Sequence, residues 1–211
     1  MCDRMRASYD ALAAEYARRL RDELDHKPFD RAMLEEFAAR VAPTGLICDL
    51  GCGPGHIARF LRDQGAQVFG LDLSEGMLTE ARRLNPDISF LRGTMLALGI
   101  GDATLSGIVA FYSLIHFDGA QLANAVAEMH RVLRENGRML AAFHTGGGIL
   151  HTTELWNYAV DLTAVLFPIQ EVVDSFAEAG FVIEKAVERD PYPEVEYQSR
   201  RAYILARKLR K

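Results

Sequence analysis

A glycine-rich turn between a short apolar run and a helical pattern constrains the fold of this chain more than any other feature. The run Leu46-Ile47-Cys48 leads into Asp49-Leu50-Gly51-Cys52-Gly53-Pro54-Gly55, and helical spacing begins at Ile57. A strand, a tight turn and a helix in this order bring backbone N–H groups to a helix N-terminus, where they can hold an anionic or polar ligand. Gly51 permits the tight turn, and the two later glycines let a ligand approach the main chain. The alternative is a turn needed only to pack the strand on the helix.

Strand-like and helix-like patterns alternate from residue 46 onward. Strands are expected at 46–50, 67–73, 88–92, 107–113 and 138–144, and helices at 55–65, 75–85 and 119–134. The last of these helices starts at Asp118, with Gln121 in the capping-box position. Such alternation predicts a parallel sheet that is covered by helices on both faces.

The segments on either side of this alternation have other patterns. Residues 4–41 are expected to be helical, with a break at Pro28. Residues 149–167 show no clean period, a helix is expected over 168–179, and 181–188 and 200–207 are expected to form an antiparallel pair of strands.

A carboxylate near the end of the second expected strand points to a ribose site. Asp72 lies about 20 residues beyond the first glycine, where doubly wound folds present an acid to a ribose diol. Its alternative role is to cap the helix that follows, but Ser74 is the better N-cap for that helix. We therefore expect Asp72 to bind ribose.

Composition excludes several classes of function. The 211 residues suit one compact domain, and 49% apolar with 25% charged residues is ordinary globular composition. A net charge of −5 argues against a binder of nucleic-acid backbones. Three cysteines in unsuitable spacing predict neither a disulfide framework nor a metal site. No apolar run approaches the ~20 residues of a membrane span and no secretory signal is evident, so a cytoplasmic location is expected.

The spacing G-x-G-x-G, with Asp49 two residues ahead of the first glycine, resembles motif I of the class I S-adenosylmethionine (SAM)-dependent methyltransferases. The resemblance covers nearly the whole chain and extends to Tyr9-Asp10-x-x-Ala13-x-x-Tyr16, to the run 131–140 and to the run 201–207. Together these are similar to the free-standing, small-molecule branch of the family. The resemblance implies an α/β fold with a Rossmann-like, doubly wound sheet of seven strands, mostly parallel with an antiparallel last strand, helices on both faces and a helical N-terminal cap. A single domain over 1–211 is then expected, with the cap in 1–43, a cofactor-binding half in 44–145 and an acceptor-side half in 146–211.

The same resemblance implies SAM as cofactor and S-adenosylhomocysteine (SAH) as product. The residues that it places around the cofactor are Asp49, Gly51, Cys52, Gly53, Pro54 and Gly55 at the methionine portion, Asp72 at the ribose, Leu73, Met77, Thr94 and Met95 at the adenine, and Tyr112, Tyr9 and Tyr16 beside or over it. Thr94 and Met95 stand where many relatives have an acid, so the adenine contact departs from the family pattern. Met77 and the two tyrosines of the cap have core packing as their alternative role.

The acceptor side has weaker signals. Residues 111–117 lack the Asn/Asp-Pro-Pro-Tyr/Phe tetrapeptide of many enzymes that methylate nucleic-acid bases, which argues against DNA or RNA as acceptor. His116 resembles a histidine that recurs here in small-molecule relatives and is a candidate base for a hydroxyl acceptor, unless it only braces its loop. Further candidates for acceptor contact are His144, His151, Trp156 and Arg200, whose alternative roles are those of loop, packing or ion-pairing residues.

We therefore predict a methyltransferase that acts on an O or N atom of a small molecule, as a monomer or homodimer without nucleic-acid, membrane or metal partners. A first alternative is a nucleotide-linked (NAD-type) oxidoreductase, which should carry G-x-G-x-x-G/A where this chain has His56. The others are a methyltransferase that acts on a protein or nucleic acid and a SAM-binding module without catalysis.

Overall fold

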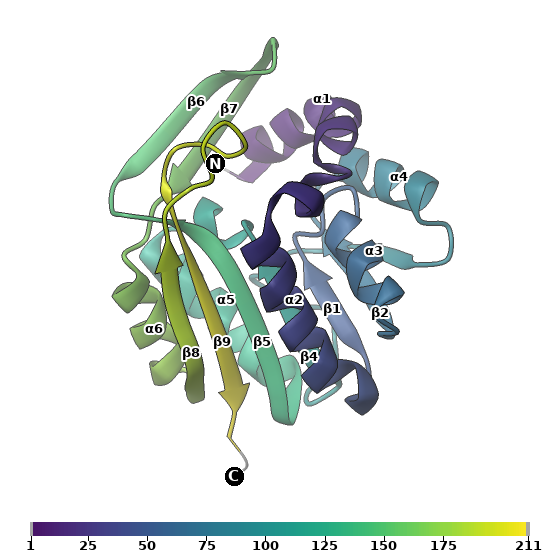
Figure 1. Ribbon diagram of the computed structural model, residues 1–211, viewed down its shortest axis with the longest axis vertical. Helices are drawn as coiled ribbons and strands as arrows, with labels where there is room; N and C mark the ends of the chain where they lie inside the picture. The colour runs from purple at the N-terminus through teal and green to yellow at the C-terminus, as the bar shows by residue number, and fades with distance from the viewer. Residues whose placement is uncertain (1, 210–211) are drawn as a thin grey trace.

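A sheet of seven strands, with helices on both faces, forms the centre of the molecule (Figure 1). The computed structural model describes residues 2–209, so the expected domain limits 1 and 211 lie outside the described residues. The strands of this sheet are β1 (Ile47–Leu50), β2 (Val68–Asp72), β3 (Ser89–Arg92), β4 (Leu105–Phe111), β5 (Leu133–Thr145), β8 (Phe181–Arg189) and β9 (Arg200–Lys208). The helices are α1 (Cys2–Leu20), α2 (Pro28–Val41), α3 (His56–Asp63), α4 (Glu75–Leu84), α5 (Gly119–Val132) and α6 (Ile169–Glu178), with short 3-10 turns η1 (Glu23–His26), η2 (Ala42–Thr44) and η3 (Leu114–His116).

The strand order is β3-β2-β1-β4-β5-β9-β8. Strands β1 to β5 are parallel to one another, and β9 lies between β5 and β8 and runs antiparallel to both. This topology confirms the predicted doubly wound sheet with an antiparallel last strand. Because the chain winds outward from β1 to β3 and then continues on the other side at β4, the carboxyl ends of β1 and β4 border the topological switch point, where such sheets bind ligands.

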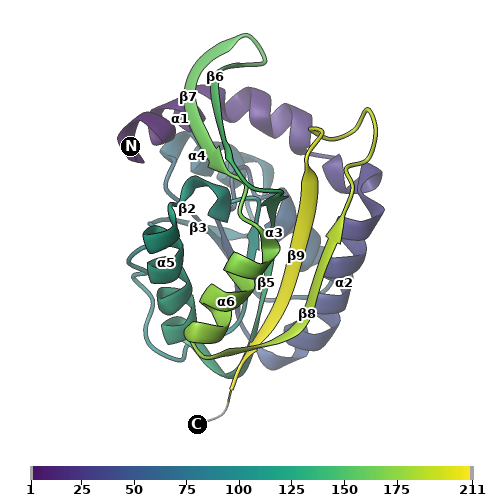
Figure 2. The ribbon, with the colours of Figure 1, turned by 90° about the vertical axis from the view of Figure 1, so that its left-hand side faces the viewer.

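Alternating residues of the buried strands supply two apolar layers. Cys48 packs with α5 and α6 on one face, whereas its neighbour Ile47 packs with α2 and α3 on the other. Figure 2 shows α5 and α6 on the side of the sheet opposite α2. The predicted capping box opens α5, because Asp118 Oδ1 accepts from the Gln121 N–H at 2.8 Å and Gln121 Oε1 accepts from the Asp118 N–H at 3.2 Å.

Two segments differ from the predictions. Strand β5 begins at Leu133 directly after α5, five residues before the predicted start, and Asn136 at φ +61° marks the irregular stretch beside the register shift in β4. Residues 149–165, which show no clean period in sequence, form a two-stranded antiparallel hairpin of β6 (Ile149–Leu155) and β7 (Tyr158–Val165). The hairpin projects beyond the sheet towards α1 (Figure 1).

Helix α1 is held between the hairpin and α4. Leu12 of α1 is fully buried in one apolar cluster with Val160 and Leu162 of β7. On its other side, Asp10 accepts hydrogen bonds from the Ser74 hydroxyl at 2.6 Å and from the Gly76 N–H at 2.9 Å. Within the described part of the chain, no helix is both long and apolar enough to cross a bilayer.

Candidate functional site

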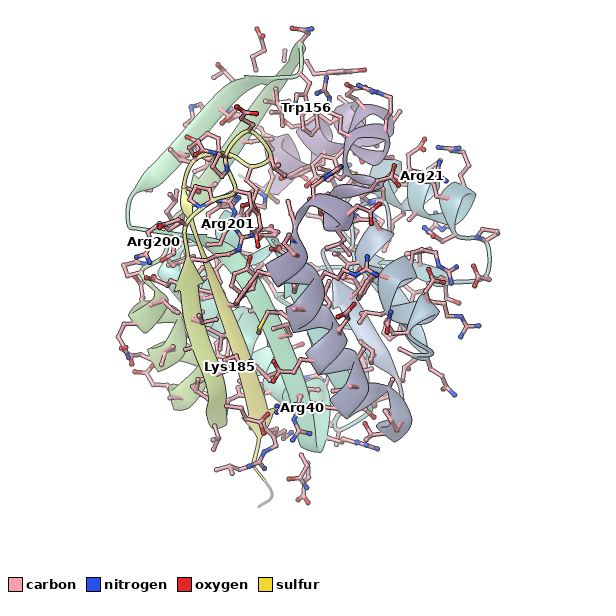
Figure 3. The ribbon with its side chains drawn as sticks, viewed as in Figure 1. Arg21, Arg40, Trp156, Lys185, Arg200 and Arg201 are labelled. Carbon is pink, nitrogen blue, oxygen red and sulfur yellow. The ribbon has the colours of Figure 1, made fainter. Side chains whose placement is uncertain are left out.

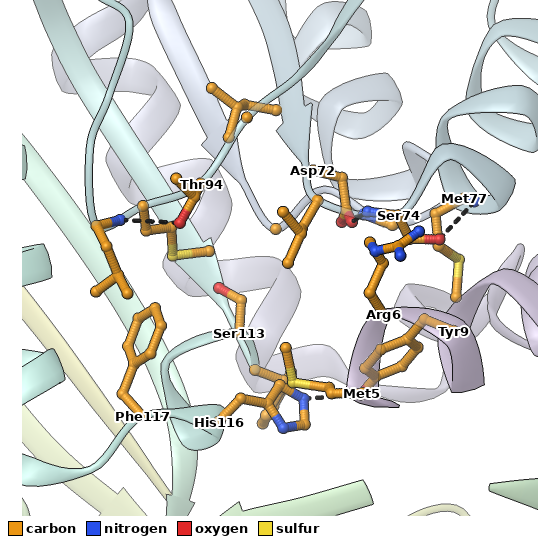
Figure 4. A pocket seen from close by; sticks show the side chains of 18 of the residues that line it. Met5, Arg6, Tyr9, Asp72, Ser74, Met77, Thr94, Ser113, His116 and Phe117 are labelled. Carbon is orange, nitrogen blue, oxygen red and sulfur yellow. Dashed lines mark hydrogen bonds between the residues drawn. The ribbon is translucent and has the colours of Figure 1, made fainter. Parts of the chain in front are cut away.

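A pocket opens at the switch point, beneath α1 (Figure 4). It contains about 1070 Å³ of space not filled by protein atoms, part of which is open to solvent. Its walls come from the turn after β1, the ends of β2 and β4, the segment after β3, and α1. The predicted residues that line it are Gly51, Gly53, Asp72, Leu73, Met77, Thr94, Met95, Tyr112, His116, Tyr9 and Tyr16.

The backbone amides of the glycine turn donate hydrogen bonds within the protein. The Gly51 and Cys52 N–H groups both donate to the Leu71 carbonyl, at 2.7 and 3.2 Å, and the Gly55 N–H donates to the Cys52 carbonyl at 3.0 Å. Gly51 has φ +69°, and a Cβ there would stand 2.4 Å from Ser113 Cβ. The turn therefore serves close packing of β1, β2 and β4, and these three amides are not available to a ligand.

Asp72 is the acid that the turn positions. Its Oδ2 accepts from the Gly53 N–H and its Oδ1 from the Ser74 N–H, each at 2.8 Å. Burial raises the pKa of Asp72, and the hydrogen bonds from Ser74 and Gly53 oppose this rise. Each oxygen retains a lone pair for a second donor, so the carboxylate can accept from two neighbouring hydroxyls.

Asp49 lies beneath the turn and outside the residues that line the pocket. Its carboxylate accepts from the Ala58 N–H in the first turn of α3, so this helix N-terminus is directed at Asp49. Burial is the main cause that raises the pKa of Asp49 to about 7. Among residues 2–209, nothing hydrogen-bonds its Oδ2. Three more residues of the turn do not line the pocket: Cys52, Pro54 and Gly55. Buried Cys52 packs with Ala58 instead.

The adenine-side residues form an apolar wall with one hydroxyl. Buried Met77 and Met95 line the pocket together with Leu73. The Thr94 hydroxyl accepts from the Leu96 N–H at 3.2 Å, which leaves its own hydrogen for another acceptor. Phe117 and Gln121 border the same pocket, although the sequence pattern did not single them out.

The roof of the pocket comes from α1. Met5, Arg6, Tyr9 and Tyr16 all line it, and only the two tyrosines were predicted. The tyrosine rings meet edge to face with centroids 6.0 Å apart, so cofactor contact and packing within the cap coexist.

His116 has both ring nitrogens engaged. Its Nδ1 lies 2.8 Å from the Thr163 carbonyl and its Nε2 lies 2.8 Å from the Tyr9 hydroxyl (Figure 4). A carbonyl only accepts, so Nδ1 carries the hydrogen and the neutral ring accepts from Tyr9 at Nε2. Burial lowers the pKa of His116, which keeps the ring neutral and able to take a proton. The ring also braces η3 against β7, so the structure contains both roles considered for it.

The other acceptor-side candidates are not brought together. Trp156 has φ +53° in the hairpin turn and packs on Tyr16, with the Arg19 guanidinium 4.9 Å from its ring centre. His151 is exposed and contacts Asp161 at 2.9 Å. Arg200 pairs with Glu188 at 2.8 Å and lies apart from Trp156, at the left-hand edge of the view in Figure 3.

His144 lies in β5, and its ring centre is 5.3 Å from that of Tyr112. Burial, and then the charges of Arg201 and Lys27, lower the pKa of His144 to about 3, so this imidazole is neutral. No cluster of metal-ligating side chains is found in the part of the chain that the structure describes.

A buried charge network behind Tyr112 was not foreseen. Tyr112 has φ +54°, which is uncommon outside glycine, and its hydroxyl donates to Asp30 at 2.7 Å. Asp30 is fully buried and also accepts from Tyr203 and from Arg189. The Arg189 guanidinium further binds Glu196, whose side chain is fully buried. The sequence signal for this network is only the density of charged and aromatic residues over 188–203.

Comparisons with known proteins agree with this geometry. Residues 47–137 match a family model described as a methyltransferase domain. The chain is 32% identical over 153 residues to a malonyl-[acyl-carrier protein] O-methyltransferase of Enterobacter lignolyticus, covering 72% of this chain and 60% of that protein. It is 29% identical over 162 residues to a demethylmenaquinone methyltransferase of Beutenbergia cavernae, covering 74% of this chain and 63% of that protein. The chain therefore spans about three fifths of the length of these curated relatives.

Solved structures share the fold. A SAM-dependent methyltransferase of Methanosarcina mazei superposes with a TM-score of 0.72 at 18% identity, over 79% of this chain and 93% of that one. A methyltransferase solved in complex with the Trm112 methyltransferase activator of Haloferax volcanii superposes with a TM-score of 0.71 at 18% identity, over 98% of both chains. A methyltransferase-domain model thus matches residues 47–137, the curated relatives are named as methyltransferases, and solved SAM-dependent methyltransferases share the fold, so this chain is similar to SAM-dependent methyltransferases in sequence and in fold.

Proposed function

We propose that this protein transfers a methyl group from SAM to an oxygen or nitrogen atom of a small-molecule acceptor and releases SAH. The observation that carries the proposal is Asp72, which faces the pocket with both oxygens fixed by backbone amides. A carboxylate fixed in this way is suited to the two hydroxyls of a ribose.

The remaining residues fit SAM by their chemistry. Leu73, Met77 and Met95 offer an apolar surface for an adenine ring. Asp49 Oδ2, a buried acceptor without a partner among residues 2–209, suits a cationic donor such as the α-ammonium group of SAM. The ribose, the adenine and the ammonium group of SAM thus each have a complementary group in or beneath the pocket.

The same geometry argues against the oxidoreductase alternative. A dinucleotide pyrophosphate needs free N–H groups at the turn and at the following helix N-terminus. Here the amides of Gly51, Cys52 and Gly53 donate to the Leu71 carbonyl and to Asp72, while the Ala58 amide donates to Asp49. A ligand without phosphate groups suits this turn better.

SAM, when bound, supplies a methyl group on a positively charged sulfur. The protein has to align an acceptor in line with that group, and orientation of reactants can be worth roughly 7–11 kcal/mol. For a hydroxyl acceptor the proposed base is His116 Nε2, acting through Tyr9: the Tyr9 hydroxyl passes its proton to Nε2 while its oxygen takes the proton of the acceptor, and the Thr163 carbonyl fixes the tautomer in which Nε2 accepts. Tyr9, which donates to this nitrogen and lines the pocket, has its pKa raised by burial and stays protonated.

The class of acceptor is supported by the relatives. The names of the two curated relatives give a malonyl group on a carrier protein and demethylmenaquinone as acceptors. Neither is a nucleic acid, in line with the net charge of −5 of this chain.

Titration calorimetry with SAH and with NAD⁺ tests the proposal. The wild-type protein should bind SAH and not NAD⁺. The Asp72→Ala variant should bind SAH about tenfold or more weakly, since hydrogen bonds to a charged group are lost. Unchanged affinity in this variant would remove the ribose assignment, and binding of NAD⁺ instead of SAH would remove the methyltransferase proposal. With SAH binding established, a screen with radiolabelled SAM separates an enzyme from a SAM-binding module.

A further inference from the structure

A second cleft borders His116, between α1 and β7. It contains about 800 Å³ of space not filled by protein atoms, part of which is open to solvent. The described residues that line it are Arg4, Met5, His116, Asp161 and Thr163. Met5 and His116 also line the pocket at the switch point (Figure 4). The cleft and the pocket therefore adjoin at these two side chains.

The cleft offers one positive and one negative side chain, both accessible to solvent. Arg4 Nη1 lies 3.5 Å from Asp161 Oδ2, and the two side chains are 82% and 42% exposed. His151 Nε2 lies 2.9 Å from the other oxygen, Asp161 Oδ1. Hydrogen bonds from His151 and from Arg4 lower the pKa of Asp161, so the group stays a carboxylate and only accepts. A contact of 3.5 Å between exposed charges is weak, so both groups can still bind a ligand.

The backbone around this charged pair is held in place. The Asp161 N–H donates to the hydroxyl of buried Ser8 at 2.8 Å, which joins β7 to α1. His116 Nδ1 lies 2.8 Å from the Thr163 carbonyl, which joins η3 to β7. These bonds fix the three elements relative to one another, so the shape of the cleft is set by the protein.

The charges in the cleft suit an uncharged ligand with hydroxyl groups. Among the described residues that line it, Arg4 and Asp161 have opposite charges, and burial lowers the pKa of His116, so this ring is neutral. An anion that approaches Arg4 also approaches Asp161, so attraction and repulsion nearly cancel. A hydroxyl both donates and accepts, so two neighbouring hydroxyls can donate to the carboxylate and accept from the guanidinium at once.

We propose that this cleft binds the methyl acceptor, and that the acceptor is an uncharged small molecule with neighbouring hydroxyl groups, such as a sugar or a catechol. The inference rests on the proposed function and adds the class of acceptor to it. One hydroxyl reaches past Met5 to Tyr9 in the pocket, while a neighbouring hydroxyl stays at Arg4 and Asp161. The reacting oxygen bonds to the methyl carbon as the bond from that carbon to sulfur breaks, and its electron pair stays on sulfur. The hydroxyl proton passes through Tyr9 to His116 Nε2.

Methyl transfer from radiolabelled SAM to four probes tests the class of acceptor on the full chain. Methyl α-D-glucopyranoside and catechol carry neighbouring hydroxyls and represent the two sources of this chemistry. Lactate carries a hydroxyl beside a negative charge, and serine carries one beside two opposite charges. The label should pass to at least one of the first two probes and to neither of the others. Label on lactate or serine, or on none of the four probes, would overturn the proposal.

Variants test whether the acceptor binds in the cleft. With the labelled diol, Arg4→Ala and Asp161→Ala should each raise KM about fivefold, the usual effect of losing one hydrogen bond, and leave kcat and SAH affinity unchanged. Asp161→Asn keeps an oxygen that accepts, so it should raise KM less than Asp161→Ala does. Arg18→Ala is the matched control, because Arg18 is exposed on the same helix, pairs with Glu15 and does not line the cleft. Thermal denaturation confirms that each variant is folded.

The outcomes separate this inference from the proposed function. If the wild-type protein binds SAH and the two alanine variants leave KM unchanged, or weaken SAH binding by the same factor, the acceptor does not bind in the cleft and the proposed function stands. If Asp161→Asn loses as much as Asp161→Ala, the acceptor is recognised by its charge, and the uncharged class is refuted. If the wild-type protein does not bind SAH, the proposed function falls, and the role of the cleft with it.

Discussion

The Asp49→Asn substitution removes a buried carboxylate whose ionisation should make the stability of the protein depend on pH. Burial, acting against the favourable charge of His56 and the Ala58 amide, raises the pKa of Asp49 from 3.8 to about 7. At a pH between these two pKa values, Asp49 keeps its proton in the folded chain and releases it in the unfolded chain. The contribution of Asp49 to stability is therefore fully present below about pH 4 and is lost as the pH rises through 7.

The magnitude follows from the difference between the two pKa values. A difference of about 3 corresponds to about 4 kcal/mol, at 1.36 kcal/mol for each pH unit. From pH 5 to pH 7 the free energy of unfolding of the wild-type protein should fall by roughly 2 kcal/mol through this group alone. The asparagine variant has no such ionisation, and its oxygen can still accept from Ala58.

Urea unfolding of both proteins at pH 5, 6, 7 and 8 measures the effect. The stability of Asp49→Asn relative to the wild-type protein should rise by roughly 2 kcal/mol from pH 5 to 7 and then level off. Other titrating groups are shared by both proteins, so they cancel in the difference. The exposed Asp63 on the same helix provides the control, because Asp63→Asn should stay within about 0.5 kcal/mol throughout. A difference for Asp49→Asn that does not change with pH would refute the reasoning.

Two further substitutions test the turn and the candidate base. Gly51→Ala combines an unfavourable positive φ with a Cβ 2.4 Å from Ser113 Cβ, so it should lower the free energy of unfolding by about 2–4 kcal/mol in urea titrations. His116→Ala should leave SAH affinity in calorimetry nearly intact and lower turnover with a hydroxyl acceptor by about 10² or more.

Each of these substitutions has a clear contrary result. Gly99→Ala is the control for the turn, because no atom lies within 4 Å of its Cβ position; equal losses for the two alanine variants would show that the clash is relieved. If His116→Ala turns over a hydroxyl acceptor as fast as the wild-type protein, the base proposal ends and His116 acts as a brace through Tyr9 and Thr163.

The parts of the fold that depend on local patterns are visible in the sequence. The capping box at Asp118 fixes the start of α5, and the alternation after residue 46 determines the parallel strands. The hairpin over 149–165 depends on tertiary packing, since its exposed strands gain their apolar contacts from α1. Its turn places Trp156 and Asn157 at positive φ, and a tryptophan there gives no turn signal.

The site shows the same division. Asp72 is predictable because its distance from the first glycine is set by the strand–turn–helix unit. The hydrogen bonds from the turn amides to the Leu71 carbonyl cannot be predicted from the sequence, because they depend on the spacing of β1 and β2 in three dimensions. Nor do patterns reveal Met5 and Arg6 in the pocket wall, or the link from Tyr112 to Asp30 across 82 positions of sequence.

Ser74 links the pocket to the helix above it. Its N–H donates to Asp72, while its hydroxyl donates to Asp10 of α1 and accepts from the Met77 N–H. Because α1 forms one wall of this pocket, the bonds of Asp10 oppose any widening of the pocket on that side. We therefore expect the dissociation rate of SAH to rise when α1 separates from α4, which would make this contact a control on the rate of product release.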